Sequence, residues 1–163
     1  MSALPEYMTT HKFKASRDQV WHCWTDPELL ARWYGPGAET TIHGYDLRVG
    51  GTWRNEMKWG EKQDFSLMEF QEISPKDLLV WLHSSVDADW NLCANPMMPD
   101  WPRQMTTRVE FSGGAGETLV KLSLIPVDAS AAEIACFAAM MGGMDSGWGA
   151  GFKAIDQILA EGG

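Results

Sequence analysis

The pattern of hydrophobic and polar residues changes within the first part of the chain. Residues 7–14 contain the aromatic and threonine residues that are typical of a strand. Ser16 then opens a segment in which large apolar residues recur at helical spacing, and Asp26 opens a shorter one over residues 28–33. The sequence Gly-Pro-Gly at 35–37 ends it, because these residues break helices. We therefore expect one strand followed by two short helices.

The stretch between residues 39 and 127 has the pattern of antiparallel strands. Gly50-Gly51 is its sharpest hairpin signal, and residues 113–116, which are mostly glycine, indicate another hairpin. The expected strands cover residues 40–49, 52–59, 65–73, 78–85, 105–111 and 118–127. Strands joined by turns this short favour one antiparallel sheet.

A long helical region follows, from a cap at Ser130 to about Ala160. Its apolar positions, spaced by three or four, are Phe137, Met140, Met141, Met144, Trp148, Phe152, Ile155 and Leu159, and its glycines are Gly142, Gly143, Gly147, Gly149 and Gly151. Each glycine costs roughly 1 kcal/mol relative to alanine, so we expect a kink, or a close approach of the backbone to the sheet or to a ligand. The order of elements predicts an α+β fold in which one amphipathic helix lies across a single curved sheet.

The composition fits one globular domain over residues 1–163. Hydrophobic residues make up 45% and charged residues 21%, so a chain of this length can bury a core and enclose a cavity. The net charge of −9 argues against nucleic acid and anionic membrane surfaces as partners. No secretory signal is visible, and the most apolar stretch, residues 131–141, is too short to span a bilayer. We expect a soluble, cytoplasmic protein.

The residues that usually carry chemistry do not cluster in the sequence. Cys23, Cys93 and Cys136 lie far apart without a Cys-x-x-Cys pair, so they predict neither a disulfide framework nor a zinc site. No histidines stand at metal-ligand spacing, and no motif of a nucleophilic enzyme is present. We expect no metal and no cofactor, and we assign no catalytic residue. The nine tryptophans and ten methionines instead favour an apolar cavity.

Short motifs occur in a specific order from about residue 12 to residue 159. They are ASRDQVW at 15–21, WTDPE at 24–28, RWYGP at 32–36, DLRVGG at 46–51 with Trp53 and Met57 after it, EISP at 72–75, TRVEF at 107–111 and GW at 147–148. Together they resemble the family of activator-of-heat-shock-chaperone-ATPase homologues in the START-like (SRPBCC, helix-grip) superfamily. The resemblance implies about seven antiparallel strands curved around the C-terminal helix, with a cavity between them. Relatives include lipid and hormone binders, polyketide cyclases and chaperone co-factors, so the fold does not settle the function.

The first hypothesis is a small hydrophobic molecule bound in that cavity. If Gly50-Gly51 sets the register, alternate residues of the following strand share one face, and the helix meets them with its own apolar residues. Methionine and aromatic side chains adapt to irregular apolar ligands. We expect the ligand to contact Trp33, Trp53, Asn55, Met57, Trp81, His83, Met144, Trp148 and Phe152. The alternative is that these side chains only fill the core.

Two other functions use the same fold. An enzyme of cyclase, hydrolase or lyase type would use His83 as a general base, oriented by Asn55 and Glu72 from neighbouring strands. The plain alternative is a histidine that is hydrogen-bonded within the core. The third hypothesis is a chaperone co-factor. The family's eukaryotic namesakes carry a separate N-terminal domain that grips the chaperone, whereas the match here begins within the first 15 residues, so we expect no stimulation of a bacterial chaperone ATPase.

Residues 87–104 form the least regular part of the sequence. They contain prolines together with Met97, Met98 and Trp101. Segments of this length are usually functional or disordered, and disorder fits poorly with so many large apolar side chains. The two hypotheses are a lid over the cavity mouth and a contact in a homodimer, which would cover these side chains.

Overall fold

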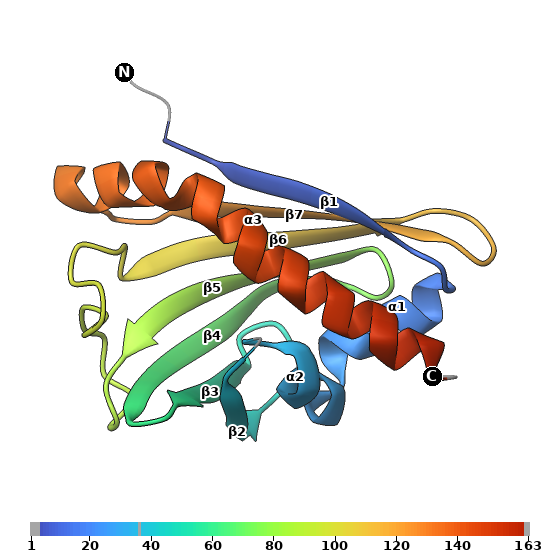
Figure 1. The fold of residues 1–163 in the computed structure, drawn as a ribbon, viewed down its shortest axis with the longest axis horizontal. Helices are drawn as coiled ribbons and strands as arrows, with labels where there is room; N and C mark the ends of the chain where they lie inside the picture. Colours follow the sequence, from blue (N-terminus) through green and yellow to red (C-terminus); the bar gives the residue numbers. More distant parts are fainter. Residues whose placement is uncertain (1–3, 36, 162–163) are drawn as a thin grey trace.

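The computed structural model describes residues 4–35 and 37–161, and its main element is a curved antiparallel sheet of seven strands. The strands follow the spatial order β1-β7-β6-β5-β4-β3-β2, so the first strand along the chain pairs with the last. Their bounds are β1 Tyr7–Phe13, β2 Glu39–Tyr45, β3 Thr52–Trp59, β4 Lys62–Ser74, β5 Leu78–Val86, β6 Gln104–Ser112 and β7 Thr118–Pro126. Figure 1 shows the sheet as one layer behind the long C-terminal helix.

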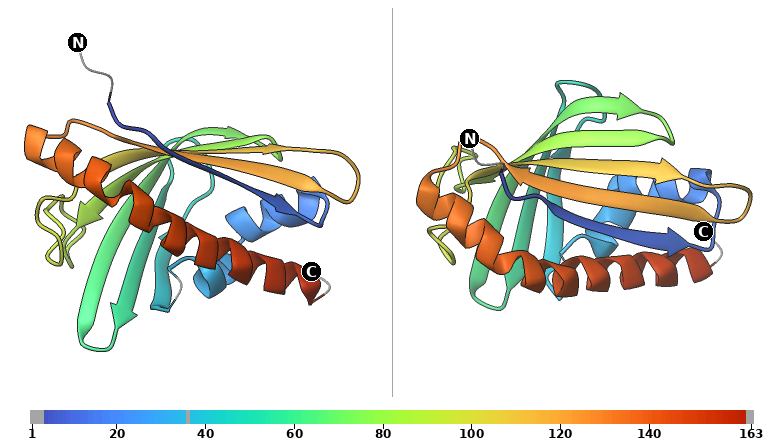
Figure 2. Two further views of the ribbon diagram at one scale, coloured as in Figure 1. Left: turned by 45° about the horizontal axis from the view of Figure 1, so that its top comes forward. Right: turned by 90° about the horizontal axis from the view of Figure 1, so that it is seen from above.

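Three helices complete the fold, each with a side-chain cap at its start. They are α1 Arg17–Thr25, α2 Pro27–Trp33 and α3 Ala131–Ala160. Ser16 and Ser130 form capping boxes with the third helical residue, and the Asp26 carboxylate accepts a hydrogen bond from the Glu28 backbone N–H at 2.8 Å. The short helices lie at one end of the sheet, and α3 crosses its concave face (Figures 1 and 2). The α+β helix-grip fold expected from the sequence is confirmed.

The core lies between the concave face of the sheet and the two ends of α3. Phe137 is buried near the start of this helix, and Gly151, Phe152, Ile155 and Ile158 are buried in its C-terminal third. In contrast, no residue from 138 to 150 is buried. The middle of α3 therefore crosses the sheet without being enclosed by it.

The connection between β2 and β3 differs from the expected two-residue hairpin. The strand expected over residues 40–49 ends at Tyr45, and residues 46–51 form a loop. The Gly50 N–H donates to the Phe70 carbonyl at 2.8 Å, and the Phe70 N–H donates to the Gly51 carbonyl at 3.0 Å. A Cβ on Gly51 would collide with the Asp46 carbonyl. The backbone of the two glycines thus lies directly against β4. Turn rules do not predict this contact, because they consider only neighbouring residues in the sequence.

Helix α3 is continuous, although its axis changes direction in its first half (Figures 1 and 2). The expected close approach of its backbone occurs only at Gly151, where a Cβ would lie 3.4 Å from the Trp33 ring. At Gly142, Gly147 and Gly149 a Cβ would meet nothing within 4 Å. Most of these glycines therefore border open space.

Polar contacts attach α3 to the first strand and to α2. The Tyr7 hydroxyl donates to the Asp145 carboxylate at 2.7 Å, and His11 Nε2 lies 3.0 Å from Asp156 Oδ2. At the end of the helix, Arg32 Nη2 bonds both Glu161 carboxylate oxygens at 2.9 Å. These contacts position the helix over the sheet, including its middle part, where residues are at most partly buried.

Candidate functional site

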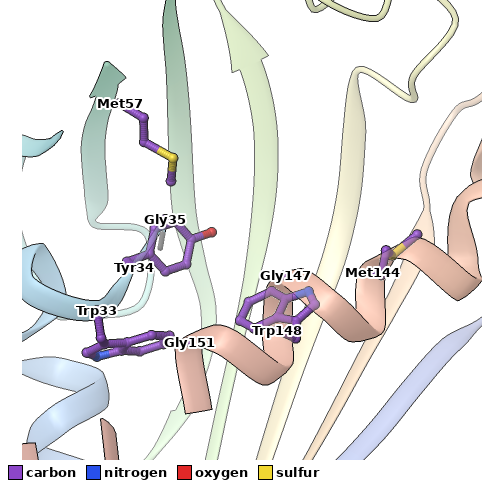
Figure 3. A pocket seen from close by; sticks show the side chains of 8 residues that line it. All are labelled: Trp33, Tyr34, Gly35, Met57, Met144, Gly147, Trp148 and Gly151. Carbon is purple, nitrogen blue, oxygen red and sulfur yellow. The ribbon is translucent and has the colours of Figure 1, made fainter. Parts of the chain in front are cut away.

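A cavity of about 270 Å³ opens between the middle of α3 and the segment that follows α2 (Figure 3). Its lining residues are Trp33, Tyr34, Gly35, Met57, Met144, Gly147, Trp148 and Gly151. None of these eight residues is charged, and the walls are mostly indole rings and methionine side chains. Such walls suit an apolar ligand with a ring, because aromatic and thioether groups pack against irregular apolar shapes.

Glycines in α3 make room for the cavity. Gly147 lies in its wall, and a side chain there would extend into open space. Gly151, one turn further, lets the Trp33 ring lie against the helix backbone. The helix therefore contributes Met144 and Trp148 to the wall and leaves the space between them free.

An aromatic cluster holds the walls in place. The Trp33 Nε1–H donates to the Cys23 carbonyl at 2.7 Å, and its ring packs edge-on against Trp24 at 4.6 Å between centroids. Trp148 lies parallel to Trp24 at 6.4 Å. These contacts fix two of the indoles that face the cavity.

Tyr34, which the sequence analysis did not select, brings a polar group to the apolar wall. It is the C-cap residue of α2 and is almost fully buried. Figure 3 shows its hydroxyl pointing into the cavity. Burial, and then the negative charge of Asp64, raise the pKa of this phenol, so it stays protonated and can donate a hydrogen bond. The sequence feature that could have identified Tyr34 is the RWYGP motif at 32–36, which contains it.

The seven apolar residues among the expected ligand-binding residues fall into two groups. Trp33, Met57, Met144 and Trp148 line the cavity. Trp53, Trp81 and Phe152 are buried in the core, with 1%, 1% and 3% of their surface exposed, and do not line it. Strand alternation for Trp53 and Trp81, and helical spacing for Phe152, correctly predicted that these side chains point inward, but they fill the core and do not line the cavity.

Asn55 lies in a polar row on the concave face. Register places it beside Ser66, which pairs with Ser85 on the next strand, and all three are buried. The Asn55 Oδ1 accepts a hydrogen bond from Trp53 Nε1 at 3.2 Å, while its Nδ2 has no hydrogen-bond partner among the described residues. The row is outside the cavity lining, although Asn55 shares a strand face with Met57.

His83 lies in the neighbouring row, between Met68 and Met105 in register. Its Nδ1 is buried and has no partner among the residues described. Burial lowers the pKa of this imidazole to about 4, so it is neutral at neutral pH. Glu72 does not orient it, because Glu72 pairs with Val80 and is exposed.

A second hollow of about 280 Å³ lies beside the first. Its lining residues are Asn95, Met97, Met98, Trp101, Met140, Gly143 and Met144, so Met144 belongs to both. Trp101 packs on Phe137 at 5.5 Å, and the Arg103 N–H donates to Glu133 at 3.0 Å. The irregular segment thus rests on the first half of α3.

The same segment also reaches the outer face of the sheet through Trp90. Its ring lies 5.5 Å from Phe65 and 5.7 Å from His43, and the Arg54 guanidinium lies 5.6 Å from its centroid. Phe65 and Arg54 alternate with the core residues of their strands. Trp90 and Trp101 therefore hold the segment on opposite sides of the sheet.

Outside the cavity, the described residues show no second candidate site of the metal-binding or reactive-thiol kind. Across residues 4–35 and 37–161, no three His, Cys, Asp or Glu side chains gather so as to hold a metal ion. Burial raises the pKa of the Cys23 thiol to about 11, which disfavours the reactive thiolate. In the described part of the chain, no helix combines the length and apolar character needed to cross a membrane.

A curved antiparallel sheet crossed by one long helix defines a START-like, helix-grip protein. Within that class, the profile of the family described as "Activator of Hsp90 ATPase homolog 1-like protein" matches residues 14–160, and the chain belongs to this family. No curated protein matches the chain.

Solved structures with the same fold come from several bacteria. Protein Ms6760 from Mycobacterium smegmatis is 23% identical, with a TM-score of 0.78 over 94% of this chain and 90% of its own. A protein from Arthrobacter aurescens is 21% identical, with a TM-score of 0.80 over 96% and 86%. DynU16, from the dynemicin biosynthetic locus, is 20% identical, with a TM-score of 0.63 over 96% of this chain and 48% of its own. At these identities the likeness concerns the fold.

Proposed function

We propose that the protein binds a small apolar molecule with a ring in the cavity between the sheet and α3. The observation that carries the proposal is the uncharged wall of indole and methionine side chains around about 270 Å³ of space. Burying about 300 Å² of apolar ligand surface contributes on the order of 7 kcal/mol, before association costs of at least about 4 kcal/mol. We expect micromolar to millimolar dissociation constants.

Binding is a better account of the site than catalysis. With its pKa near 4, His83 is a weak base at neutral pH, and it is absent from the cavity wall. The relative DynU16 comes from a biosynthetic locus, which supports a small molecule as the partner in this fold. The three free cysteines support a reducing, cytoplasmic compartment.

Titration of probes into a pair of glycine variants tests the proposal. Gly147→Leu places a side chain in the cavity, whereas Gly149→Leu makes the same change on the same helix outside the lining. Trp33 and Trp148 line the site, so ligand binding will change the intrinsic fluorescence. Naphthalene-like, flavonoid and fatty-acid probes are added to each protein while emission and melting temperature are measured.

We expect at least one probe class to bind the wild type and Gly149→Leu, and to bind Gly147→Leu at least tenfold more weakly. Native mass spectrometry of freshly purified protein will show whether a small molecule co-purifies. If no probe changes the emission or melting temperature of the wild type, the proposal fails. Equal binding by both variants would place any ligand elsewhere.

We also propose that the protein forms a homodimer through the surface around the second hollow. Met97 and Met140 are 44% and 38% exposed there, and a partner would cover them. Light scattering over a range of concentrations will show a mass above that of the 18.2 kDa chain. A mass that stays at that value throughout would contradict the dimer.

A further inference from the structure

The Tyr34 hydroxyl is a polar group in an otherwise apolar wall. It points into the cavity, and no described residue forms a hydrogen bond with it (Figure 3). The Trp33 Nε1–H in the same wall is different, because it donates to the Cys23 carbonyl. A hydroxyl in such surroundings is stabilised when an occupant supplies the missing hydrogen-bond partner.

The position of this hydroxyl is set before any ligand arrives. The Tyr34 N–H donates to the Leu30 carbonyl at 2.8 Å, and the Tyr34 carbonyl accepts from the Thr40 hydroxyl at 2.6 Å. The ring packs edge-on against Trp53 at 4.8 Å and against Trp148 at 6.2 Å. A group fixed on both its backbone and its ring loses little freedom on binding, so its hydrogen bond contributes to selectivity.

The electrostatics of the cavity disfavour an anion. None of its lining residues is charged, so no cation is available to pair with a buried carboxylate. Burial and then the negative charge of Asp64 raise the pKa of Tyr34. The phenol therefore offers a proton to an acceptor, and the site offers nothing to neutralise a charge.

We propose that the occupant is a neutral, ring-bearing molecule whose carbonyl oxygen accepts a hydrogen bond from the Tyr34 hydroxyl. This inference rests on the proposed function and adds the chemical class of the ligand. Ketones, quinones and esters fit the class. Fatty acids and aromatic carboxylates do not, because their charge would be buried without a partner.

Three matched naphthalene probes test this inference. Acetylnaphthalene carries the carbonyl, isopropylnaphthalene has nearly the same shape without it, and naphthoate replaces it with a carboxylate. One hydrogen bond to a neutral group predicts that acetylnaphthalene binds roughly three- to tenfold more tightly than isopropylnaphthalene. Naphthoate is expected to bind at least roughly tenfold more weakly than acetylnaphthalene.

A pair of tyrosine variants assigns the effect to Tyr34. Tyr34→Phe removes the hydroxyl from the cavity wall, and the preference for acetylnaphthalene over isopropylnaphthalene is expected to disappear. Tyr45→Phe is the control, because the Tyr45 hydroxyl likewise has no hydrogen-bond partner among the described residues but does not line the cavity. This control keeps the preference of the wild type.

Each result supports or overturns the inference. Equal binding of the two uncharged probes, a preference that survives Tyr34→Phe, or tightest binding of naphthoate overturns it and leaves the proposed function intact. If none of the probes binds the wild type, the proposed function fails as well. Should Tyr34→Phe not fold, the carbonyl ¹³C resonance of acetylnaphthalene decides. It moves upfield from its position in water if the bound carbonyl loses its hydrogen bonds, which overturns the inference, and it stays or moves downfield if the carbonyl is hydrogen-bonded in the cavity.

Discussion

The middle and the C-terminal third of α3 have similar apolar patterns but different surroundings. Phe152, Ile155 and Ile158 in the last third are buried against the sheet and the short helices. Met144 and Trp148 in the middle face the same way and remain partly exposed around a cavity. Helical periodicity thus shows which face turns inward, but it does not show whether that face meets packed side chains or open space.

Glycine accounts for the difference between the two parts. In the middle of α3, Gly147 removes a side chain that would fill the cavity. In the last third, Gly151 forms the end of the cavity wall, and its missing side chain lets the backbone lie close to the Trp33 ring. The same residue type therefore opens the structure at one position and tightens it at the other.

The largest expected effect comes from removing a side chain in the packed part. Phe152→Ala is expected to lower the free energy of unfolding by about 3–5 kcal/mol, because it leaves a cavity in the core. Met144→Ala in the open middle is expected to cost less than about 1 kcal/mol. Urea unfolding measures both. If the two variants lost similar free energies of unfolding, the packed and open parts of α3 would not differ as described.

Adding a side chain is expected to have opposite effects on stability at Gly151 and at Gly149. Gly151→Leu is expected to lower the free energy of unfolding by about 1–3 kcal/mol, because the new side chain meets the Trp33 ring. Gly149→Leu is expected to raise it by up to roughly 1 kcal/mol through helix propensity alone. The test is denaturant unfolding of both proteins, and destabilisation by Gly149→Leu would mean that the middle of the helix is packed.

His83, in the sheet that α3 crosses, makes the free energy of unfolding depend on pH. Its folded pKa of about 4 lies below the unfolded value of 6.5, so the unfolded state binds the proton more readily. The stabilisation is complete above about pH 6.5 and is lost as the pH falls toward 4. One pKa unit corresponds to about 1.4 kcal/mol. His83 as a whole is only partly buried, although its Nδ1 is enclosed, so solvent screening reduces the expected loss to about 1 kcal/mol at about pH 5.

Urea unfolding of His83→Gln at several pH values checks this dependence. The variant is expected to lose the slope between about pH 6.5 and about pH 5. The matched control is His22→Gln, because the His22 side chain is 63% exposed. A slope that persists in His83→Gln would show that other groups cause it.

The smallest expected effect is a stabilisation by alanine in the open middle. Gly142→Ala and Gly149→Ala are each expected to raise the free energy of unfolding by about 0.5–1 kcal/mol, because their new methyl groups meet no neighbour. Neither change is expected to alter probe affinity, since neither residue lines the cavity. Thermal melting and the fluorescence titration measure the two quantities, and a loss of stability would indicate crowding at these positions.

The sequence predicted the architecture and part of the cavity wall. Local spacing and the family motifs indicated every strand and helix, because capping residues and alternation act over a few residues. Trp33, Met57, Met144 and Trp148 were selected and line the cavity. Trp53 was selected on the same grounds and is buried in the core. Whether an inward side chain lines the cavity or is buried in the core depends on packing between distant elements, and a local sequence pattern does not show that packing.

Two features depended on contacts between residues far apart in the chain. Tyr34 lies at a helix end, where no periodicity shows that its ring will be held by Trp53 and Trp148. Gly50-Gly51 read locally as a hairpin turn, whereas its backbone bonds to Phe70 in β4. Residue 36, within the expected helix-ending sequence, lies outside the described residues, and α2 itself ends at Trp33.

The pairing of β1 with β7 delays the completion of the sheet during synthesis. Tyr7 pairs with Leu124, so β1 has no partner in the sheet until β7, the last of the seven strands along the described chain, has been made. The neighbouring strands from β2 to β5 pair with close neighbours in sequence and can form earlier. Until β7 appears, β1 exposes the apolar side chains of Tyr7 and Phe13 on an unpaired strand, which favours association between unfinished chains. Closure of the sheet, and the bond from Tyr7 to Asp145 that attaches α3, therefore come late in folding.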